Sequence, residues 1–270
     1  MDIKELHEKI LYPVVRVRTE KAGGSGSVIA CLPDPENDGE HQTFVLTNWH
    51  VVEAAISTTK EWNSVMQKDI KVEVLKQVQV ELFDYARLSE VTGGNARRAN
   101  IVGYDKNQDL AVLLLDDPKP WPYVAKVIDR DAVRDVKLFT EVWASGCSLG
   151  HDPFANPGRI TFLKEDIENK LYWMLNANSI FGNSGGPVFH AETGDIVGVT
   201  ARVSVIQLGF GFDVQTWMNF CIPPQRLYEF FDEQCLEFLY DGEHTYKDAM
   251  KRREKKQQQA LLALRREDED

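Results

Sequence analysis

The stretch FGNSGGPVF, Phe181–Phe189, combines a loosened backbone with the start of an apolar run. Three glycines and an asparagine surround one serine, Ser184, and the chain then turns at once into apolar residues typical of a strand. Glycine weakens a strand and frees the backbone. It also leaves neighbouring amide hydrogens unobstructed, so we interpret the stretch as a hydroxyl placed beside exposed N–H groups. A Gly-rich hairpin turn is the alternative.

Two other residues support a nucleophilic role for this serine. A serine hydroxyl needs a base within hydrogen-bond reach, and the base needs a group that orients it. His50 ends the apolar run VLTNWHVV, and Asp109 begins another in DKNQDLAVLLL. Taken singly, the histidine is more often structural and the aspartate more often a cap. Together, in the order His, Asp and Ser, each at the rim of an expected strand, they predict a catalytic triad.

The organisation of the chain is that of two β-rich halves. Short runs rich in Val, Ile, Leu and aromatic residues, separated by Gly, Asn, Asp and Pro, are typical of antiparallel barrels or sandwiches. In the first half they are VVRVRTE, GSVIAC, FVLTNWHVV, KVEVLKQVQVELF, ANIVGYD and DLAVLLLD, and in the second LFTEVWAS, GRITFLKE, LYWMLNA, GPVFHA, DIVGVTARV and GFGFDV. TGGNARR, Thr92–Arg98, suggests a hairpin turn. DDPKPWPYV carries three prolines and is expected to link the halves.

The two ends are expected to be helical. Ile3, Leu6 and Ile10 follow helical spacing, and QRLYEFFDEQCLEFLYDG after Pro224 does the same. The tail 246–270 is dense in charged residues and Gln, and we expect a solvated helix that either binds a partner or is a plain extension. The predicted division is therefore an N-terminal helix (1–11), a first barrel (12–120), a second barrel (121–224) and a helical extension (225–270).

Composition excludes several classes of function. The chain has 270 residues, is 43% hydrophobic and 27% charged, and carries a net charge of −11, which argues against a nucleic-acid binder. No apolar stretch is long enough to suggest a membrane span. The first ten residues are charged and lack a signal-peptide core. The four cysteines are widely spaced, which favours reduced, mostly buried thiols over disulfides or a metal site. We therefore expect a cytoplasmic protein without a metal or cofactor.

At this point the sequence resembles a known family. The motifs GGSGSVIA, VLTNWHVV, GYDKNQDLAVLLL, ASGCSLG, NANSIFGNSGGPVF, DIVGVTA and FCIPP occur in the order seen in chymotrypsin-like (trypsin-fold) serine proteases, most similar to the HtrA/Do branch. The resemblance covers most of the chain, from about Tyr12 to Pro224. It implies two six-stranded antiparallel β-barrels with the site in the cleft between them.

The resemblance also implies a role for each site residue. Ser184 would attack the scissile carbonyl, His50 would carry its proton, and Asp109 would orient the histidine. The backbone N–H groups of Gly182 and Ser184, with Asn183 between them, would form the oxyanion hole. The S1 pocket, which holds the side chain before the scissile bond, would be lined by Asn178, Ser179, Ile180, Thr200, Ala201 and Arg202.

Several positions depart from the family pattern. Digestive members carry Asp immediately before the serine, where it pairs with a new N-terminus. Asn183 has no charge to pair, so we predict no zymogen cleavage. Asn178 stands at the base of the expected S1 pocket, and its lack of charge favours a small or aliphatic side chain there over Arg or Lys. Cys147 is interpreted as a structural thiol. Only 46 residues follow Pro224, too few for the PDZ domain usual in HtrA proteins.

The sequence therefore predicts a serine endopeptidase that acts on proteins or peptides. A homo-oligomer is a candidate assembly, and neither nucleic acid nor a membrane is expected as a partner. A catalytically silent protease-fold module that binds through its C-terminal helix is the alternative.

Overall fold

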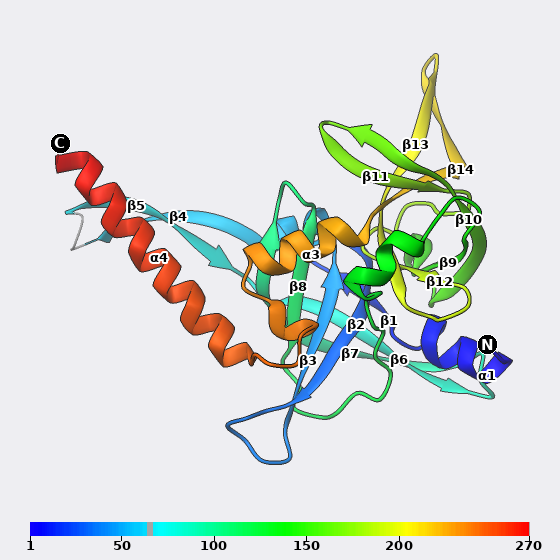
Figure 1. The fold of residues 1–270 in the computed structure, drawn as a ribbon, viewed down its shortest axis with the longest axis horizontal. Helices are drawn as coiled ribbons and strands as arrows, with labels where there is room; N and C mark the ends of the chain where they lie inside the picture. Colours follow the sequence, from blue (N-terminus) through cyan, green and yellow to red (C-terminus); the bar gives the residue numbers. More distant parts are fainter. Residues whose placement is uncertain (64–66, 270) are drawn as a thin grey trace.

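The strands of the protein, described here from a computed structural model for residues 1–63 and 67–269, form two closed antiparallel barrels of six strands each. The first barrel comprises β1 (Val14–Arg18), β2 (Gly23–Pro33), β3 (His41–Thr47), β6 (Val78–Ala86), β7 (Glu90–Asp105) and β8 (Leu110–Leu115). The second comprises β9 (Glu141–Gly146), β10 (Phe154–Ile167), β11 (Lys170–Leu175), β12 (Pro187–His190), β13 (Ile196–Leu208) and β14 (Gly211–Ile222). Figure 1 shows the barrels side by side, which confirms the predicted fold class.

Most pairs in each barrel join strands that follow one another in the chain, and two pairs per barrel join distant strands: β3–β8 and β1–β6 in the first, β11–β14 and β9–β12 in the second. The first runs β1-β2-β3-β8-β7-β6 and closes through β1 and β6, and the second runs β10-β11-β14-β13-β12-β9 and closes through β9 and β10. Alternation of buried and exposed residues along β6 directs one face inward, as expected for a strand with one solvated face. β8 is buried almost throughout, because it lies against both the barrel interior and the seam.

The hydrophobic core has three parts. One cluster fills the first barrel, around Val45, Val80 and Leu113. A second fills the second barrel, around Ile160 and Leu175. The third is the largest and crosses the seam; its fully buried members include Phe44, Leu110, Tyr172, Phe189, Phe230 and Leu236. Because that cluster draws residues from both barrels and from the C-terminal helices, burial of apolar surface holds the two barrels together.

The connection between the barrels is anchored to both of them. The backbone N–H groups of His41 and Ala125 donate to Pro118 and Val28 carbonyls, each at 2.8 Å, which ties the segment to the first barrel. Further along, Ile128 donates to Ile196 at 3.0 Å, in the second barrel. The 3-10 turn η3 (Arg130–Asp135) follows. The connection between the barrels is therefore held to both of them by backbone hydrogen bonds.

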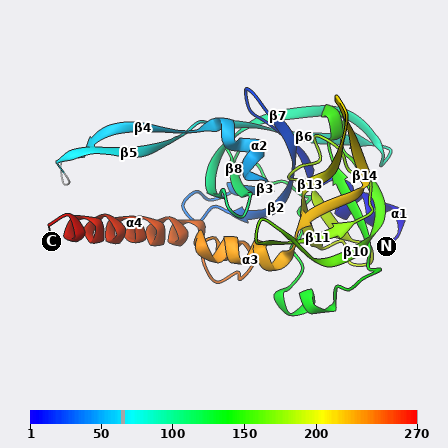
Figure 2. The same cartoon turned by 90° about the horizontal axis from the view of Figure 1, so that it is seen from above.

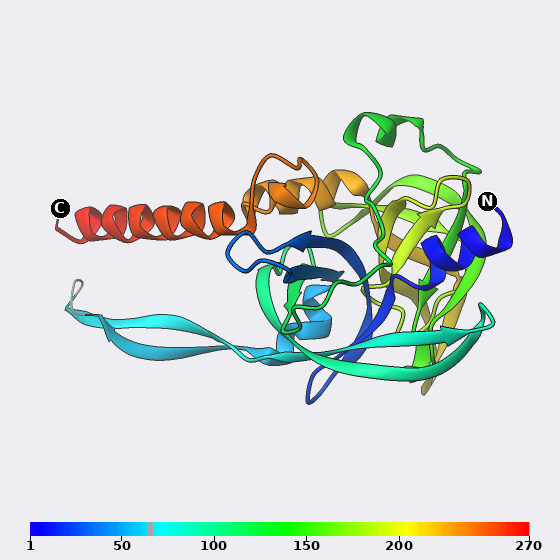
Figure 3. The ribbon, with the colours of Figure 1, turned by 90° about the horizontal axis from the view of Figure 1, so that it is seen from below.

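Helices lie at both ends of the chain, as predicted. The first is α1 (Ile3–Leu6), continued by the π-helical turn η1 (His7–Leu11), and a capping box at Asp2 begins it. After the second barrel come α3 (Pro224–Glu233), the 3-10 turn η5 (Glu237–Leu239) and α4 (Tyr246–Glu269). Figures 2 and 3 show α4 extending away from the barrels, with the two-stranded sheet of β4 (Ile56–Asn63) and β5 (Lys68–Leu75) extending toward the same side.

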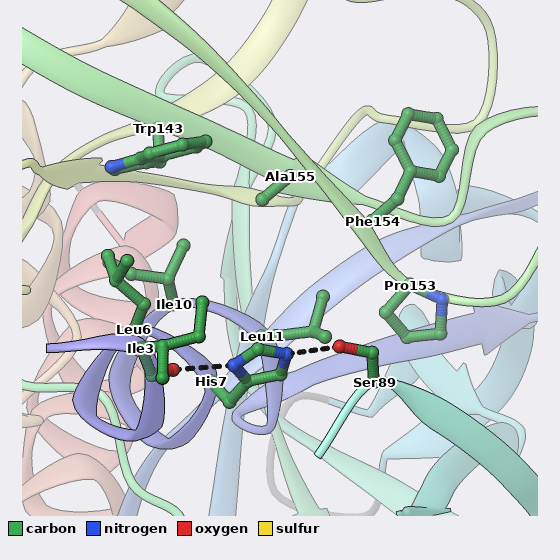
Figure 4. A pocket seen from close by; sticks show the side chains of 10 residues that line it. All are labelled: Ile3, Leu6, His7, Ile10, Leu11, Ser89, Trp143, Pro153, Phe154 and Ala155. Carbon is green, nitrogen blue, oxygen red and sulfur yellow. Dashed lines mark hydrogen bonds between the residues drawn. The ribbon is translucent and has the colours of Figure 1, made fainter. Parts of the chain in front are cut away.

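The N-terminal helix packs against the second barrel and borders an open, mostly apolar cavity of about 340 Å³. Figure 4 shows Leu6 and Ile10 facing this cavity from the helix, and Trp143 and Ala155 from the barrel. His7 Nδ1 donates to the Ile3 carbonyl, and Nε2 forms a hydrogen bond with the Ser89 hydroxyl, both at 2.6 Å. This cavity is lined by none of the residues predicted for catalysis.

Two predictions about local structure are wrong. Thr92–Arg98 is no hairpin turn, because the whole segment belongs to β7 and pairs with β6. The turn lies at Arg87 and Leu88, which adopt left-handed φ values of 46° and 65° without being glycine. KVEVLKQVQVELF is not one strand either. Its first part is β5 in an exposed arm and its second part is β6 in the barrel, so tertiary pairing divides a uniform run.

Candidate active site

The histidine and the aspartate predicted for the triad are in contact. β3 ends at Thr47, and the one-turn helix α2 (Trp49–Val52) carries His50, so the histidine stands just past the strand rather than within it. His50 Nδ1 lies 2.9 Å from Asp109 Oδ2 and 3.0 Å from Oδ1. The backbone N–H of His50 donates to the same carboxylate at 3.1 Å. Asp109 therefore holds both the ring and the backbone of His50.

The loop that carries Asp109 is held by groups from three directions. Asp109 has a φ of 56°, a left-handed conformation that Asp tolerates better than most residues. Asn48 Nδ2 donates to the Asp109 carbonyl at 2.8 Å. Arg226 of α3 donates to the Gln108 side chain at 2.8 Å and to the Gln108 carbonyl at 2.9 Å. The carboxylate side chain is only 15% exposed, so this scaffold sets its direction.

The segment before Ser184 forms a tight turn. Asn183 N donates to the Ile180 carbonyl at 3.1 Å, and Gly182, at the third position, has a φ of 97°. A positive φ at that position is the mark of a type II turn and suits glycine. The Phe181 carbonyl accepts from Leu149 N at 2.8 Å. Because a trans peptide directs its N–H opposite to its C=O, the Gly182 N–H points away from Leu149.

Two amides in this segment have no acceptor. Of the five consecutive N–H groups from Gly182 to Gly186, the three of Asn183, Gly185 and Gly186 donate to backbone carbonyls. The N–H groups of Gly182 and Ser184 make no hydrogen bond within the part of the chain that the structure describes. Unpaired amides in a half-buried turn are uncommon, since backbone groups removed from water are nearly always satisfied. They are available to an incoming acceptor.

Ser25 organises this turn, and sequence reasoning missed its role. Its hydroxyl donates to the Gly182 carbonyl and accepts from Cys147 N, both at 2.7 Å. Its backbone N–H donates to the Ser184 carbonyl at 2.8 Å. Ser25 itself is fully buried. The only signal in the sequence was its place within GGSGSVIA, which gives a small hydroxyl residue among glycines but says nothing of its partners.

Ser184 lies where the barrels meet. A Cβ at Gly185, the next residue, would stand 2.3 Å from Thr47 Oγ1 and 3.0 Å from Asn48 N, so only glycine lets the loop approach the chain just before His50. Within the described residues the Ser184 hydroxyl makes no hydrogen bond, to His50 or to any other group. The structure thus brings His50 and Asp109 together, sets the Ser184 backbone against the same strand end, and leaves the serine hydroxyl unengaged.

The residues predicted for the S1 pocket lie on two segments of the second barrel. Asn178 is exposed, Ser179 is buried and Ile180 is half-buried, and they lead directly into the turn. The others are on β13, where Thr200 and Ala201 are buried and Arg202 is half-buried. Gly185 N donates to the Thr200 carbonyl at 2.8 Å, which places the two segments on either side of the serine loop. Arg202 pairs with Glu168 at 2.8 Å.

Asn183 and Cys147 have structural surroundings. The Asn183 amide is buried, donates to Ser179 Oγ at 3.1 Å and accepts from the Ser148 hydroxyl at 2.5 Å. Both ends of this neutral side chain are therefore satisfied without a charged partner. Cys147 is 1% exposed, and burial raises the pKa of its thiol to about 12. A thiol held neutral in this way is inert, whereas a reactive cysteine is a thiolate.

The fold and this arrangement define the class of protein. Residues 24–199 match the model of the trypsin-like peptidase domain, and the chain belongs to that family. Its relatives include "Protease Do-like 1, chloroplastic" from Arabidopsis thaliana, 24% identical over 185 residues, which are 65% of this chain and 35% of that protein. A "Probable periplasmic serine endoprotease DegP-like" from Halomonas elongata is 25% identical over 204 residues, 74% of this chain and 32% of the relative. The predicted HtrA/Do resemblance is confirmed.

Solved structures show the same fold. Deg5 superposes with a TM-score of 0.57 and 20% identity, covering 89% of this chain and 97% of that one. The HtrA-type protease AlgW superposes with a TM-score of 0.58 and 19% identity, covering 89% and 65% respectively. The chain spans about a third of the length of the curated relatives described above.

Two further findings bear on the other predictions. Among the described residues, no group of three or more His, Cys, Asp or Glu side chains is arranged to hold a metal ion. Across the same part of the chain, no helix combines the length and the apolar character that crossing a bilayer requires.

Proposed function

We propose that this protein is a serine endopeptidase in which Ser184, His50 and Asp109 form the catalytic triad. Ser184 attacks the scissile carbonyl, and His50 accepts its proton and returns it to the leaving amine. Asp109 keeps Nδ1 of His50 protonated, so that Nε2 faces the serine as a base. The N–H groups of Gly182 and Ser184 stabilise the negative oxygen of the tetrahedral intermediate.

One observation carries the proposal: the two unpaired amides lie in the same turn as the serine, and their neighbours are all satisfied. A turn built only for structure would be expected to pair these donors as it pairs the amides of Asn183, Gly185 and Gly186. Here the carbonyls of Phe181 and Gly182 are both pinned, by Leu149 N and the Ser25 hydroxyl, so neither occupies the space in front of the amides. That is the preorganisation an oxyanion requires.

The unengaged Ser184 hydroxyl is compatible with this mechanism. A serine side chain rotates about a single bond, and catalytic hydrogen bonds in unliganded proteins are often long and tighten only with substrate. The His50 side chain is 39% exposed, and within the described residues its Nε2 atom makes no hydrogen bond, so this nitrogen can receive the proton. We propose that substrate binding completes the contact between Ser184 and His50.

The surroundings of the serine favour particular substrates. Neither Asn178 nor the other proposed S1 residues bears a carboxylate, and Arg202 on β13 is a cation. A pocket of this kind gives Arg or Lys no partner, so we propose a small or aliphatic residue before the scissile bond. Asn183 is satisfied by Ser179 and Ser148, so we propose that activity requires no cleavage of the chain near its N-terminus.

The test is labelling with a fluorophosphonate, together with cleavage of a peptide library by the full chain. We expect Ser184 to be labelled without prior proteolysis, and Ser184→Ala to abolish both labelling and hydrolysis. Asp109→Asn should lower kcat by roughly 10⁴, because the amide stabilises the wrong tautomer of His50. The thermal transition of both variants serves as the control for folding.

The outcome also separates the enzyme from a silent binding module. If the folded wild type is neither labelled nor active over a range of substrate and protein concentrations, the endopeptidase is ruled out. If the cleaved peptides carry mostly Arg or Lys before the cleaved bond, the protein is an endopeptidase but the proposed S1 preference is wrong.

A further inference from the structure

A second cavity lies directly beside the oxyanion turn. Its volume is about 210 Å³. It is lined by Phe181 and Gly182 of the turn and by Gly23 and Gly24 of β2. The remaining lining comes from Arg16, Arg18, Cys147, Leu149 and Gly150. The cavity thus shares the Gly182 turn with the candidate active site but is built mainly from the first barrel and the loop after β9.

This cavity lies on the side of Ser184 where the leaving-group half of a bound peptide would be expected. The proposed S1 residues, which would hold the acyl half, lie on the second barrel before the turn and on β13. β2 passes the serine on the other side: Ser25 N donates to the Ser184 carbonyl, and a Cβ at Gly24 would meet that carbonyl at 2.8 Å. A peptide that crosses Ser184 from the S1 residues therefore continues toward β2, with its leaving-group half entering the cavity.

The two arginines in the cavity differ in charge compensation. Arg16 is buried; its guanidinium lies 2.9 Å from Glu81 and 3.8 Å from Asp152, and it also donates to the Gly150 carbonyl. Arg18, at the exposed end of β1, has no ion pair or side-chain hydrogen bond within the described residues. Arg16 is therefore neutralised and structural, and Arg18 supplies the uncompensated positive charge.

The residue paired with Arg18 leaves space for a ligand. Arg18 faces Gly23 across the β1–β2 pair, and a Cβ at Gly23 would approach Arg18 Cγ no closer than 3.9 Å. Gly23 has an ordinary φ, so no backbone strain requires a glycine there. A larger side chain would project into the space beside the Arg18 guanidinium. Glycine keeps that space open, and a planar guanidinium is suited to a carboxylate.

We propose that this cavity binds a carboxylate side chain, Asp or Glu, located one to three residues after the scissile bond, and that Arg18 recognises it. This inference rests on the proposed endopeptidase function and specifies its substrates. Three extended residues span roughly 10 Å, so the acidic side chain enters the cavity while the scissile bond is at Ser184. Arg18 is a specificity residue that touches substrate and takes no part in bond cleavage.

The test uses internally quenched peptides with one shared acyl half and an amidated C-terminus. Glu, Gln or Lys is placed in turn at the first, second and third positions after the scissile bond, and kcat/KM is measured. At one position we expect kcat/KM for Glu to exceed that for Gln by about 1.5- to fivefold, the range for an exposed ion pair, with a smaller ratio at high salt. Arg18→Gln should abolish the difference, and Arg18→Glu should reverse it in favour of Lys.

The matched control is Arg134→Glu, which makes the same change in net charge on η3, outside the cavity. It should retain the preference of the wild type. Equal kcat/KM for Glu, Gln and Lys at all three positions, with cleavage intact, would overturn the inference and leave the endopeptidase standing. A Glu preference that survives in Arg18→Gln would also overturn it. If the wild type cleaves none of the peptides and is not labelled by the fluorophosphonate, the proposed function itself is rejected.

Discussion

At the scale of single residues, Ser25 shows how much the candidate site depends on a side chain that would touch no substrate. Its hydroxyl holds the Gly182 carbonyl and satisfies Cys147 N, and its backbone holds Ser184. The free N–H of Gly182 is therefore directed by a serine 157 residues earlier in the chain. That arrangement gives the buried hydroxyl of Ser25 a structural role.

Ser25→Ala should impair turnover more than substrate binding. We expect kcat to fall about 10- to 100-fold, less than the roughly 10²–10³ lost when an oxyanion donor itself is removed, with little change in KM. The free energy of unfolding should fall by about 1–3 kcal/mol, because Cys147 N loses its acceptor in a buried place. Steady-state kinetics and urea unfolding measure the two effects.

Ser27→Ala is the matched control for this prediction. Ser27 is on the same strand and equally buried, but its hydroxyl has no hydrogen-bond partner among the described residues. Removing it should leave kcat unchanged and stability unchanged or higher. If Ser25→Ala behaved like Ser27→Ala, the role assigned to Ser25 would be wrong.

At the scale of elements, α3 joins the two barrels through one arginine. Arg226 is 4% exposed and donates to Gln108 in the first barrel and to the Leu171 carbonyl in the second, the latter at 3.1 Å. Its guanidinium also lies 4.8 Å from the centre of the Tyr172 ring. Among the described residues, its hydrogen-bond acceptors are amide and carbonyl oxygens, and none is a carboxylate. The helix thereby positions the loop that presents Asp109.

Arg226→Lys should loosen that loop although the charge is kept. A lysine cannot reproduce the four hydrogen bonds that the guanidinium donates, because its single ammonium group lacks the planar, forked geometry. We expect a loss of about 2–3 kcal/mol in the free energy of unfolding and a lower kcat. The control is Arg130→Lys, because Arg130 is half-exposed and pairs with Asp232 of α3. This substitution should lower the free energy of unfolding by less than about 1 kcal/mol. Equal effects of the two substitutions would refute the assignment.

At the scale of the whole molecule, the apolar cores bury several titratable groups: Cys147 and Tyr228 in the seam between the barrels, and Cys221 in the second barrel. Burial raises the pKa of the thiols of Cys147 and Cys221, and of the Tyr228 hydroxyl, to about 12 in each case. The reference value is 9.0 for a thiol and 10.0 for a tyrosine. Below about pH 9 these groups are neutral in both the folded and the unfolded chain, so they leave stability unchanged.

Above that pH the unfolded chain loses these protons first. The free energy of unfolding should therefore fall as pH rises from about 9 toward 12, by up to about 1.4 kcal/mol per pH unit for each group. Urea unfolding between pH 7.5 and 10.5 measures the slope. Cys221→Ala, which removes a fully buried thiol, should make the slope above pH 9 shallower. An unaltered slope in this variant would contradict the prediction.

The candidate site was only partly predictable from the sequence. His50, Asp109 and Ser184 stand beside turn residues and apolar runs, and such local signals can be read along the chain. The contact between His50 and Asp109 spans 59 residues, and its geometry depends on barrel closure. The local sequence around Ser25 and Arg226 does not indicate their partners, because those partners are distant in the chain. The error at Thr92–Arg98 has the same origin: paired glycines favour a turn locally, and strand pairing with β6 overrides that preference.

By itself the sequence determined the class of fold, through apolar runs separated by turn residues, and the types of side chain available for chemistry. These depend on patterns within a few residues of each other, which the chain carries before it folds. The tertiary structure alone decided which amides lack acceptors, which arginine is neutralised, and which hydroxyl holds the turn before Ser184. Those properties depend on distances between segments from 65 to more than 150 residues apart, which are set only when both barrels close and pack around a common core.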